Sequence, residues 1–173
     1  MKLSETLKYS LIFILFNALQ VIWVKDFAFY NLGFCFMYLA FIISLPLSIP
    51  VPLMLLIAFA NGIIIDSFYD TMGIHAAATV AVAYFRKHIL NLLTPLGGYE
   101  EVSVISIEAI SLQWYIIYIS VLVFLHLSIL FFIEASGFGF FFWTLLKIIC
   151  STLLTTFMIV SFNYIFFTRS SKR

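Results

Sequence analysis

The chain has 173 residues, of which 64% are hydrophobic and only 10% charged, with a mean hydropathy of +1.15. A soluble domain of this size cannot bury so much apolar surface, so the composition indicates a polytopic membrane protein. The net charge of +1, without a long basic tract, excludes nucleic acid as a partner class. Cys35 and Cys150 both lie within apolar runs, which indicates membrane-buried residues instead of a disulfide or a metal pair.

Hydropathy predicts an all-α fold: one integral membrane domain over residues 1–173 with about six transmembrane helices. About 20 apolar residues are needed to cross the hydrocarbon core of a bilayer. The expected spans cover residues 7–24, 27–45, 51–69, 72–93, 114–133 and 138–167. Lys2 and Lys8 precede the first apolar run as in a signal peptide, but no small-x-small cleavage site follows, so this run is expected to be retained.

Prolines and glycines divide the chain between the spans. Pro46, Pro50 and Pro52 end the second span, because proline lacks an amide donor and clashes with the preceding turn. Residues 94–113 form the one long non-spanning stretch. The spacing of its apolar residues fits a surface helix and a strand equally well, and its structure is left open.

Small residues mark the third and fourth spans. The helix-packing residues, spaced by four within each span, are Ala58, Gly62, Gly73, Ala77 and Ala81. Residues four apart share one side of a helix, and small residues let two membrane helices approach closely. We therefore predict a tight antiparallel hairpin between these two spans.

Asp66 continues the first of these stripes, and Asp70 lies four residues further on. A charge at the centre of a bilayer helix costs about 2.5–3.5 kcal/mol, so both acids should lie at a membrane edge or face a protected interior. Asp66 is expected to end the third span and Asp70 to cap the fourth. Two carboxylates one turn apart can hold a divalent cation, but the flanking pattern of phosphate-transferring membrane enzymes is missing. No catalytic residue, metal site or cofactor is predicted, and the chain is not expected to be an enzyme.

Polar pairing across helices is expected within one group of residues: Asp66, Asp70, His75, Glu134 and Lys147. A tight hairpin would bring His75 close to the two aspartates. Lys147 is expected to pair with either Glu134 or Asp66.

Two further polar features lie in the fifth and sixth spans. His126 is expected to be a neutral histidine hydrogen-bonded across helices. Thr144, Ser151 and Thr155 share one side of the sixth span with Lys147. Their hydroxyls either bond to helix carbonyls or a neighbouring helix, or line a cavity.

The distribution of positive charge predicts the orientation. With six spans and a cytoplasmic N-terminus, one cation (Lys25) falls outside, Lys147 lies within the membrane, and seven cations fall in the cytoplasm: Lys2, Lys8, Arg86, Lys87, Arg169, Lys172 and Arg173. Both termini are therefore expected to be cytoplasmic, with the two aspartates of the hairpin at the outer face.

The stretch Asn61-Gly-Ile-Ile-Ile-Asp-Ser-Phe-Tyr-Asp-Thr-Met-Gly-Ile-His-Ala-Ala-Ala78, with Ala83-Tyr-Phe-Arg86 after it, resembles the signature of the bacterial rod shape-determining MreD family. That pattern is a Gly, a short apolar run, an Asp, a polar loop, then Gly-x-His before small residues and a basic helix end. The residues that match it are Gly62, Asp66, Gly73, His75 and Arg86. Size and predicted spans are similar along the whole chain, but only this stretch is specific.

The resemblance implies a non-enzymatic subunit of the complex that elongates the cell wall and maintains cell shape, in the bacterial cytoplasmic (inner) membrane. The implied partners are MreC, the glycosyltransferase RodA with its partner penicillin-binding transpeptidase, membrane lipid, and indirectly the MreB filament. The implied fold is similar to the substrate-binding subunits of energy-coupling-factor transporters. Packing of small-residue faces such as Gly73, Ala77 and Ala81 against the membrane helix of MreC is the expected mechanism.

A second interpretation belongs to a different class, the substrate-binding subunit of a vitamin-type transporter. Its cavity would lie near the outer face and be lined by Asp66, His75 and the hydroxyls of the sixth span. Such a subunit requires a ligand and a cytoplasmic coupling partner. Recovery of a named partner by affinity purification would separate the two interpretations.

Overall fold

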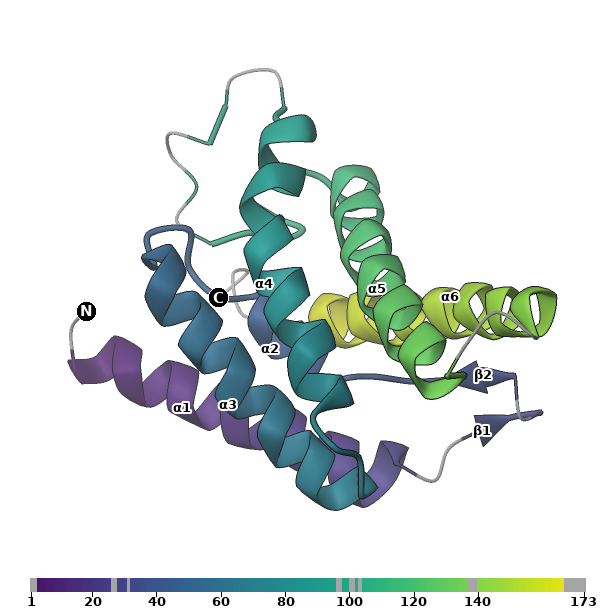
Figure 1. The fold of residues 1–173 in the computed structure, drawn as a ribbon. Coiled ribbons are helices and arrows are strands. Elements are labelled where there is room, and N and C mark those ends of the chain that lie inside the picture. Colours follow the sequence, from purple (N-terminus) through teal and green to yellow (C-terminus); the bar gives the residue numbers. More distant parts are fainter. Residues whose placement is uncertain are drawn as a thin grey trace.

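The computed structural model describes residues 3–25, 28–30, 32–95, 98–99, 102, 104–136 and 140–166. Within these residues the chain is a bundle of helices with one small hairpin of strands (Figure 1). The elements in chain order are α1 (Leu3–Leu19), η1 (Gln20–Val24), β1 (Ala28–Phe29), β2 (Gly33–Phe34), α2 (Leu39–Ile43), α3 (Val51–Tyr69), α4 (Ile74–Leu92), α5 (Leu112–Glu134) and α6 (Phe141–Phe166).

Four helices of the described structure are long and apolar enough to cross a membrane, as the composition predicts: Glu5–Val24, Val51–Tyr69, Leu112–Glu134 and Phe141–Ile165. They make the chain a mostly helical membrane protein. α4 is a helix of 19 residues near the bounds expected for the fourth span. It contains Arg86, Lys87 and His88, and its crossing of the membrane stays a prediction.

The expected helix over residues 27–45 is wrong. Its described part contains two short antiparallel strands, β1 and β2, an extended stretch, and the five-residue helix α2. Tyr30 turns the hairpin with a positive φ of 51°. Nine consecutive residues, Cys35 to Ile43, are buried, so this segment lies inside the bundle instead of on its lipid-facing surface.

Side chains from other helices replace the backbone hydrogen bonds that a helix would have made here. On α6, the Ser151 hydroxyl accepts the amide of Phe34 at 2.9 Å, and the Thr155 hydroxyl accepts the amide of Phe36 at 3.2 Å. The Gln20 amide donates to the carbonyl of Cys35 at 3.1 Å. Irregular backbone is tolerated at membrane depth only where protein groups satisfy it, and these three side chains do so. The segment is therefore stable without being a helix.

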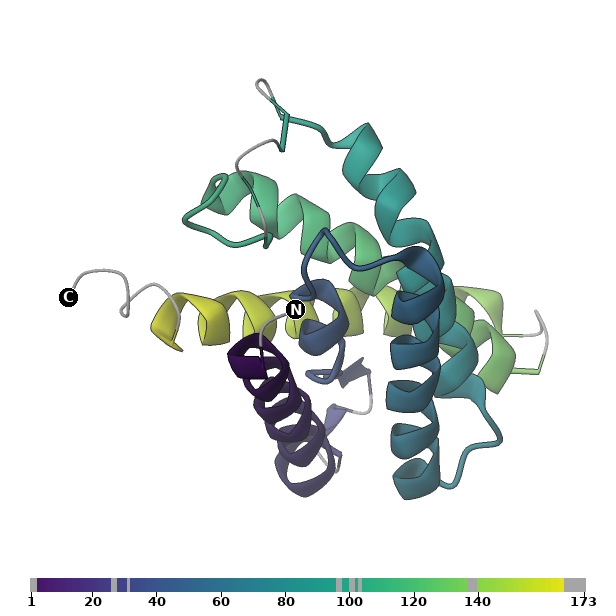
Figure 2. The same cartoon turned by 90° about the vertical axis from the view of Figure 1, so that its left-hand side faces the viewer.

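The other helices pack around this central segment. α3 and α4 form a tight antiparallel hairpin, which is the hairpin predicted by the small-residue spacing, and α5 follows beside α4 (Figure 1). α6 packs on α5 and β2 and runs across α3 and α4 instead of alongside them (Figure 2). α1 contacts α2 and lies at the edge of the bundle.

Turns connect α4 to α5 in the described part of residues 94–111, which forms neither the surface helix nor the strand left open by the sequence. Two aromatic residues hold this connection against α4. The Tyr99 hydroxyl donates to the carbonyl of Leu90 at 2.8 Å, and the Trp114 indole donates to the carbonyl of Leu93 at 2.5 Å. Burial raises the pKa of Tyr99, so the phenol stays protonated and able to donate this bond. α5 then begins with Ser111 as its N-cap.

Replacement of Thr155 by Val should destabilise the protein by about 1–3 kcal/mol, because the shape is kept while the Phe36 amide loses its acceptor. Thr152→Val is the matched control: Thr152 is also buried on α6, but its hydroxyl bonds to the carbonyl of Ile148 in the same helix. The measurement is the free energy of unfolding in mixed micelles. Equal losses for the two variants would contradict the role given to Thr155.

Candidate functional site

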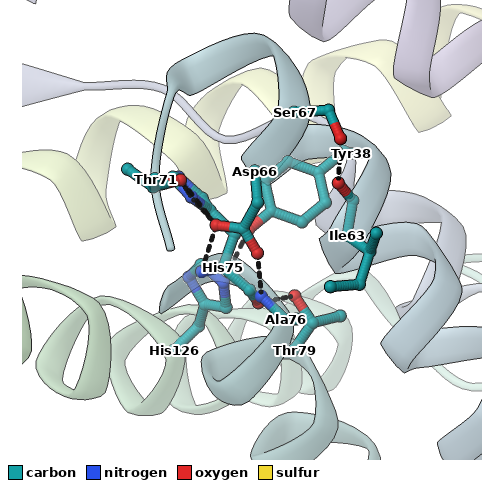
Figure 3. A network of polar contacts seen from close by, with 9 residues as sticks. All are labelled: Tyr38, Ile63, Asp66, Ser67, Thr71, His75, Ala76, Thr79 and His126. Atoms are coloured by element: carbon teal, nitrogen blue, oxygen red, sulfur yellow. Dashed lines mark hydrogen bonds and ion pairs between the residues drawn. The ribbon is translucent and has the colours of Figure 1, made fainter. Parts of the chain in front are cut away.

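Asp66 is the centre of a polar cluster that joins α3 to the start of α4 (Figure 3). Its Oδ1 accepts the amide of His75 at 3.0 Å and the hydroxyl of Thr71 at 2.5 Å, and its Oδ2 accepts the amide of Ala76 at 2.9 Å. The His75 Nδ1 lies 3.1 Å from the same Oδ1 and completes an ion pair when protonated. The carboxylate thus satisfies amides at the N-terminus of α4, where the helix dipole favours negative charge.

The expected cap by Asp70 is wrong, because Asp66 on the preceding helix occupies that place. Asp70 is exposed and ends α3 in the left-handed conformation, with its amide donating to the carbonyl of Asp66. Gly73 has a φ of 85° and precedes the first residue of α4. A glycine adopts that conformation without strain, so Gly73 shapes the turn instead of packing along the helix.

Gly62 allows the closest approach between α3 and α4. A Cβ built on Gly62 would lie 2.2 Å from the Cα of Ala76, which no real structure tolerates. Gly62 and Ala58 are both buried, as helix-packing residues should be. On α4, however, Ala76 faces α3, whereas Ala77 is exposed and Ala81 half-buried. The Asp66 cap fixes the rotation of α4 so that Ala76 faces α3. Ala77 is one residue further and points about 100° away from α3. The packing expected for Ala77 is therefore wrong.

His126 forms a second polar contact near the Asp66 cluster. Its Nε2 lies 2.7 Å from the hydroxyl of Tyr38, the residue before α2, and both side chains are fully buried (Figure 3). The sequence predicted a hydrogen bond across helices for this histidine but no partner. Tyr38 was missed because it lies in an apolar run expected to be an ordinary lipid-facing helix. The Nδ1 atom of His126 has no partner among the described residues.

Lys147 lies against aromatic rings instead of a carboxylate. Its Nζ is 5.7 Å from the ring centroid of Phe34 and 5.9 Å from that of Phe131. An ion pair of Lys147 with Glu134 or Asp66 was expected, and the described structure contains neither. A cation above a ring face is attracted by the ring quadrupole, which compensates part of the lost hydration of the ammonium group.

A pocket of about 280 Å³ opens beside this lysine. Its charged lining residues are Lys25, Glu134 and Lys147, and His75 with several aromatic side chains completes the wall. Of the hydroxyls on the sixth span, Ser151 and Thr155 bond to the central segment, while Thr144 lines a neighbouring hollow. Ser151 and Thr155 therefore hold the central segment by hydrogen bonds and do not line the pocket of about 280 Å³.

Arg86 lies inside the bundle. The count of positive charges had placed it at a cytoplasmic helix end, and that expectation is wrong. Only 1% of Arg86 is exposed. Its Nε donates to the Tyr118 hydroxyl at 2.8 Å. Its Nη2 donates to the carbonyl of Ile43 at 3.1 Å and to that of Leu45 at 2.5 Å. The guanidinium thus joins α4, α5 and the end of α2. It was predicted as a motif residue, but its contacts were not visible in the sequence.

The chemistry available to this cluster is mainly structural. Asp66 makes four polar contacts, three at Oδ1 and one at Oδ2, and all of them go to residues in the turn or the first turn of α4. Among the described residues, no three His, Cys, Asp or Glu side chains are grouped so as to hold a metal ion. The cluster is therefore suited to locking α3 against α4.

Comparison with known proteins adds no relative. No family model, curated protein or solved structure matches this chain. The functional argument therefore depends on the geometry of the residues themselves.

Gly62→Ala should lower the melting temperature strongly, because the added methyl group collides with the backbone of Ala76 and forces the hairpin apart. We expect a loss of about 1–3 kcal/mol or more. Gly33→Ala is the matched control, since a Cβ there meets nothing closer than 3.5 Å. Thermal unfolding in detergent measures both variants, and a Gly62 variant as stable as the Gly33 variant would contradict the close approach.

Proposed function

We propose that this chain is a non-enzymatic membrane subunit of the cell-wall elongation complex, of the MreD type, which helps to maintain cell shape. It would pack against MreC and the peptidoglycan synthases, RodA with its partner transpeptidase, and act on the MreB filament only indirectly. The observation that carries the proposal is that all five residues of the quoted motif have defined positions in the packing of the bundle.

Each motif residue supports the proposal through a physical role. Gly62 permits close contact, Asp66 and His75 pair at the start of α4, and Gly73 forms the turn. Arg86 ties α4 to α2 and α5. A motif used for shape and not for reaction is what a scaffold subunit requires.

The outer side of α4 offers a surface for the membrane helix of MreC. Ala77 is exposed and Ala81 half-buried, so neither is fully covered by the bundle. Tyr84 follows on the same helix and is also exposed. Small residues allow close contact between membrane helices, and helix association in lipid depends on such packing.

The double substitution Ala77→Leu and Ala81→Leu should abolish recovery of MreC with the tagged protein, because the added side chains hold the partner helix away. Ala60→Leu is the matched control. Ala60 is also exposed, but it lies two residues before Gly62 and hence about 200° around α3 from the side that meets α4. Affinity purification from gently solubilised membranes with mass spectrometry gives the readout. Undiminished recovery of MreC would contradict this surface.

We infer an inner-membrane location with both termini in the cytoplasm. Without the buried Arg86, six of the counted positive charges remain on the cytoplasmic side against Lys25. Although residues 27–45 are not a helix, Gln20 bonds to Cys35 at one end of α2 and Arg86 bonds to Leu45 at the other. The segment between them thus takes the chain back across the bundle, which supports the expected orientation.

Met72→Cys should react with a membrane-impermeant maleimide added to spheroplasts, since Met72 is fully exposed in the turn between α3 and α4. Leu92→Cys, at the opposite end of α4 and 84% exposed, should react only after permeabilisation. Labelling of Leu92→Cys but not of Met72→Cys in intact spheroplasts would show that the protein has the opposite orientation.

One observation favours the transporter-type alternative. The pocket of about 280 Å³ between Lys25, Glu134 and Lys147 is close to the lower size limit of small-molecule sites, and its wall combines aromatic side chains with a few charged groups. Recovery of an ATPase with its membrane coupling subunit, in place of MreC or RodA, would favour a substrate-binding subunit.

A further inference from the structure

A second pocket lies at the other end of the bundle from the Asp66 cluster, where α4 ends and α3 begins. It has a volume of about 340 Å³. The loop before α3 contributes Leu47, Ile49 and Pro50, and the first turn of α3 contributes Val51 and Met54. The wall is therefore largely apolar on this side.

A buried charge is among the residues that line the pocket. Arg86 lines it, is 1% exposed, and contacts only neutral groups: a phenol oxygen, two carbonyl oxygens and a sulfur atom. No carboxylate contacts this guanidinium in the described structure. A buried charge that no carboxylate contacts is costly, and an anion in the pocket would compensate it.

The donors of Arg86 are unevenly used. A guanidinium has five N–H groups. The Nε hydrogen is bonded to Tyr118, and Nη2 makes two contacts with carbonyl oxygens. Nη1 carries two hydrogens, and its one contact within the described part of the chain is the weak acceptor Sδ of Met54 at 3.9 Å. Met54 also lines the pocket. Nη1 is thus the donor group that remains for an oxygen anion.

The rest of the polar wall is positively charged and therefore complementary to an anion. Lys87, Asn91 and Tyr99 line the pocket with Arg86, which gives two cations and no acid among its described lining residues. The pocket at the opposite end differs, because Glu134 lies there beside its two lysines. Basic pockets between helix ends bind the head groups of anionic lipids, whose phosphate offers charged oxygens next to an apolar glycerol and acyl region.

We propose that this pocket binds the phosphate group of an anionic phospholipid, with Arg86 and Lys87 as the cations and the start of α3 beside the apolar part. The inference does not depend on the proposed function. It assigns a ligand class to the one motif residue, Arg86, that lies far from the Asp66 cluster.

The test is thermal unfolding of the full-length protein in mixed micelles of dodecyl maltoside with either phosphatidylglycerol or phosphatidylcholine. A ligand that binds only the folded state raises the melting temperature, and the shift grows with the logarithm of the ligand concentration divided by its Kd. We expect phosphatidylglycerol to raise it by several degrees and phosphatidylcholine to leave it unchanged. Native mass spectrometry should retain bound phosphatidylglycerol.

Two variants locate the site. Asn91→Trp fills the pocket without a change in charge. The concentration of phosphatidylglycerol needed for a given rise in melting temperature should increase about tenfold or more in this variant. Lys87→Gln removes the exposed cation and should increase that concentration by a smaller factor. Lys8→Gln, an exposed lysine on α1 outside the pocket, is the charge-matched control and should behave like the unmodified chain. Arg86 itself is left intact because it also holds α2.

Three results would overturn the proposal. The first is an equal shift with phosphatidylcholine. The second is an undiminished shift with phosphatidylglycerol in both Asn91→Trp and Lys87→Gln. The third is a shift of the same size with inorganic phosphate alone, which would make the site one for free phosphate instead of a lipid.

Discussion

Backbone amides and carbonyls inside a membrane protein must find hydrogen-bond partners in the protein itself, and the segment from Leu32 to Leu45 is where this constraint decides the structure. It is buried but only briefly helical. Four side chains from three other elements bond to its backbone: Gln20 of η1, Arg86 of α4, and Ser151 and Thr155 of α6. The helices are therefore arranged around this segment as much as around one another. Loss of any one of these side chains leaves a backbone group buried without a partner.

The same constraint governs the start of α4. The first amides of a helix have no partner within it, and here the carboxylate of Asp66 accepts two of them from a neighbouring helix. One side chain near the end of α3 thus caps α4 and fixes the rotation between the two helices. Gly62 makes that geometry possible because it leaves room for the backbone of Ala76. This rigid hairpin is a reasonable foundation for a subunit whose proposed work is to hold other membrane proteins in place.

Charge is handled differently at the two ends of the bundle. Near the Asp66 cluster the cation Lys147 lies over aromatic rings, and Glu134 shares the pocket beside it. At the other end the guanidinium of Arg86 is surrounded by neutral acceptors, and the adjoining pocket carries a second cation without an acid. Burial of an uncompensated charge is among the largest costs a protein can have. The asymmetry makes the second pocket the place where an external anion has most to contribute.

The sequence by itself determined the membrane character and the positions of the long helices, because these follow from apolar length. It also predicted the tight hairpin from small residues, of which Gly62 on α3 makes the close contact. It also selected Gly62, Asp66, Gly73, His75 and Arg86 as the residues of interest. Only the tertiary structure decided that residues 27–45 are not a single helix. The hydrogen bonds that replace the helical ones come from Gln20 and from Ser151 and Thr155, which lie more than 100 positions away in the sequence. The tertiary structure also decided that Asp66 and not Asp70 caps α4, and that Ala76 and not Ala77 meets Gly62. Both depend on the rotation of one helix against another, which spacing along the chain does not specify.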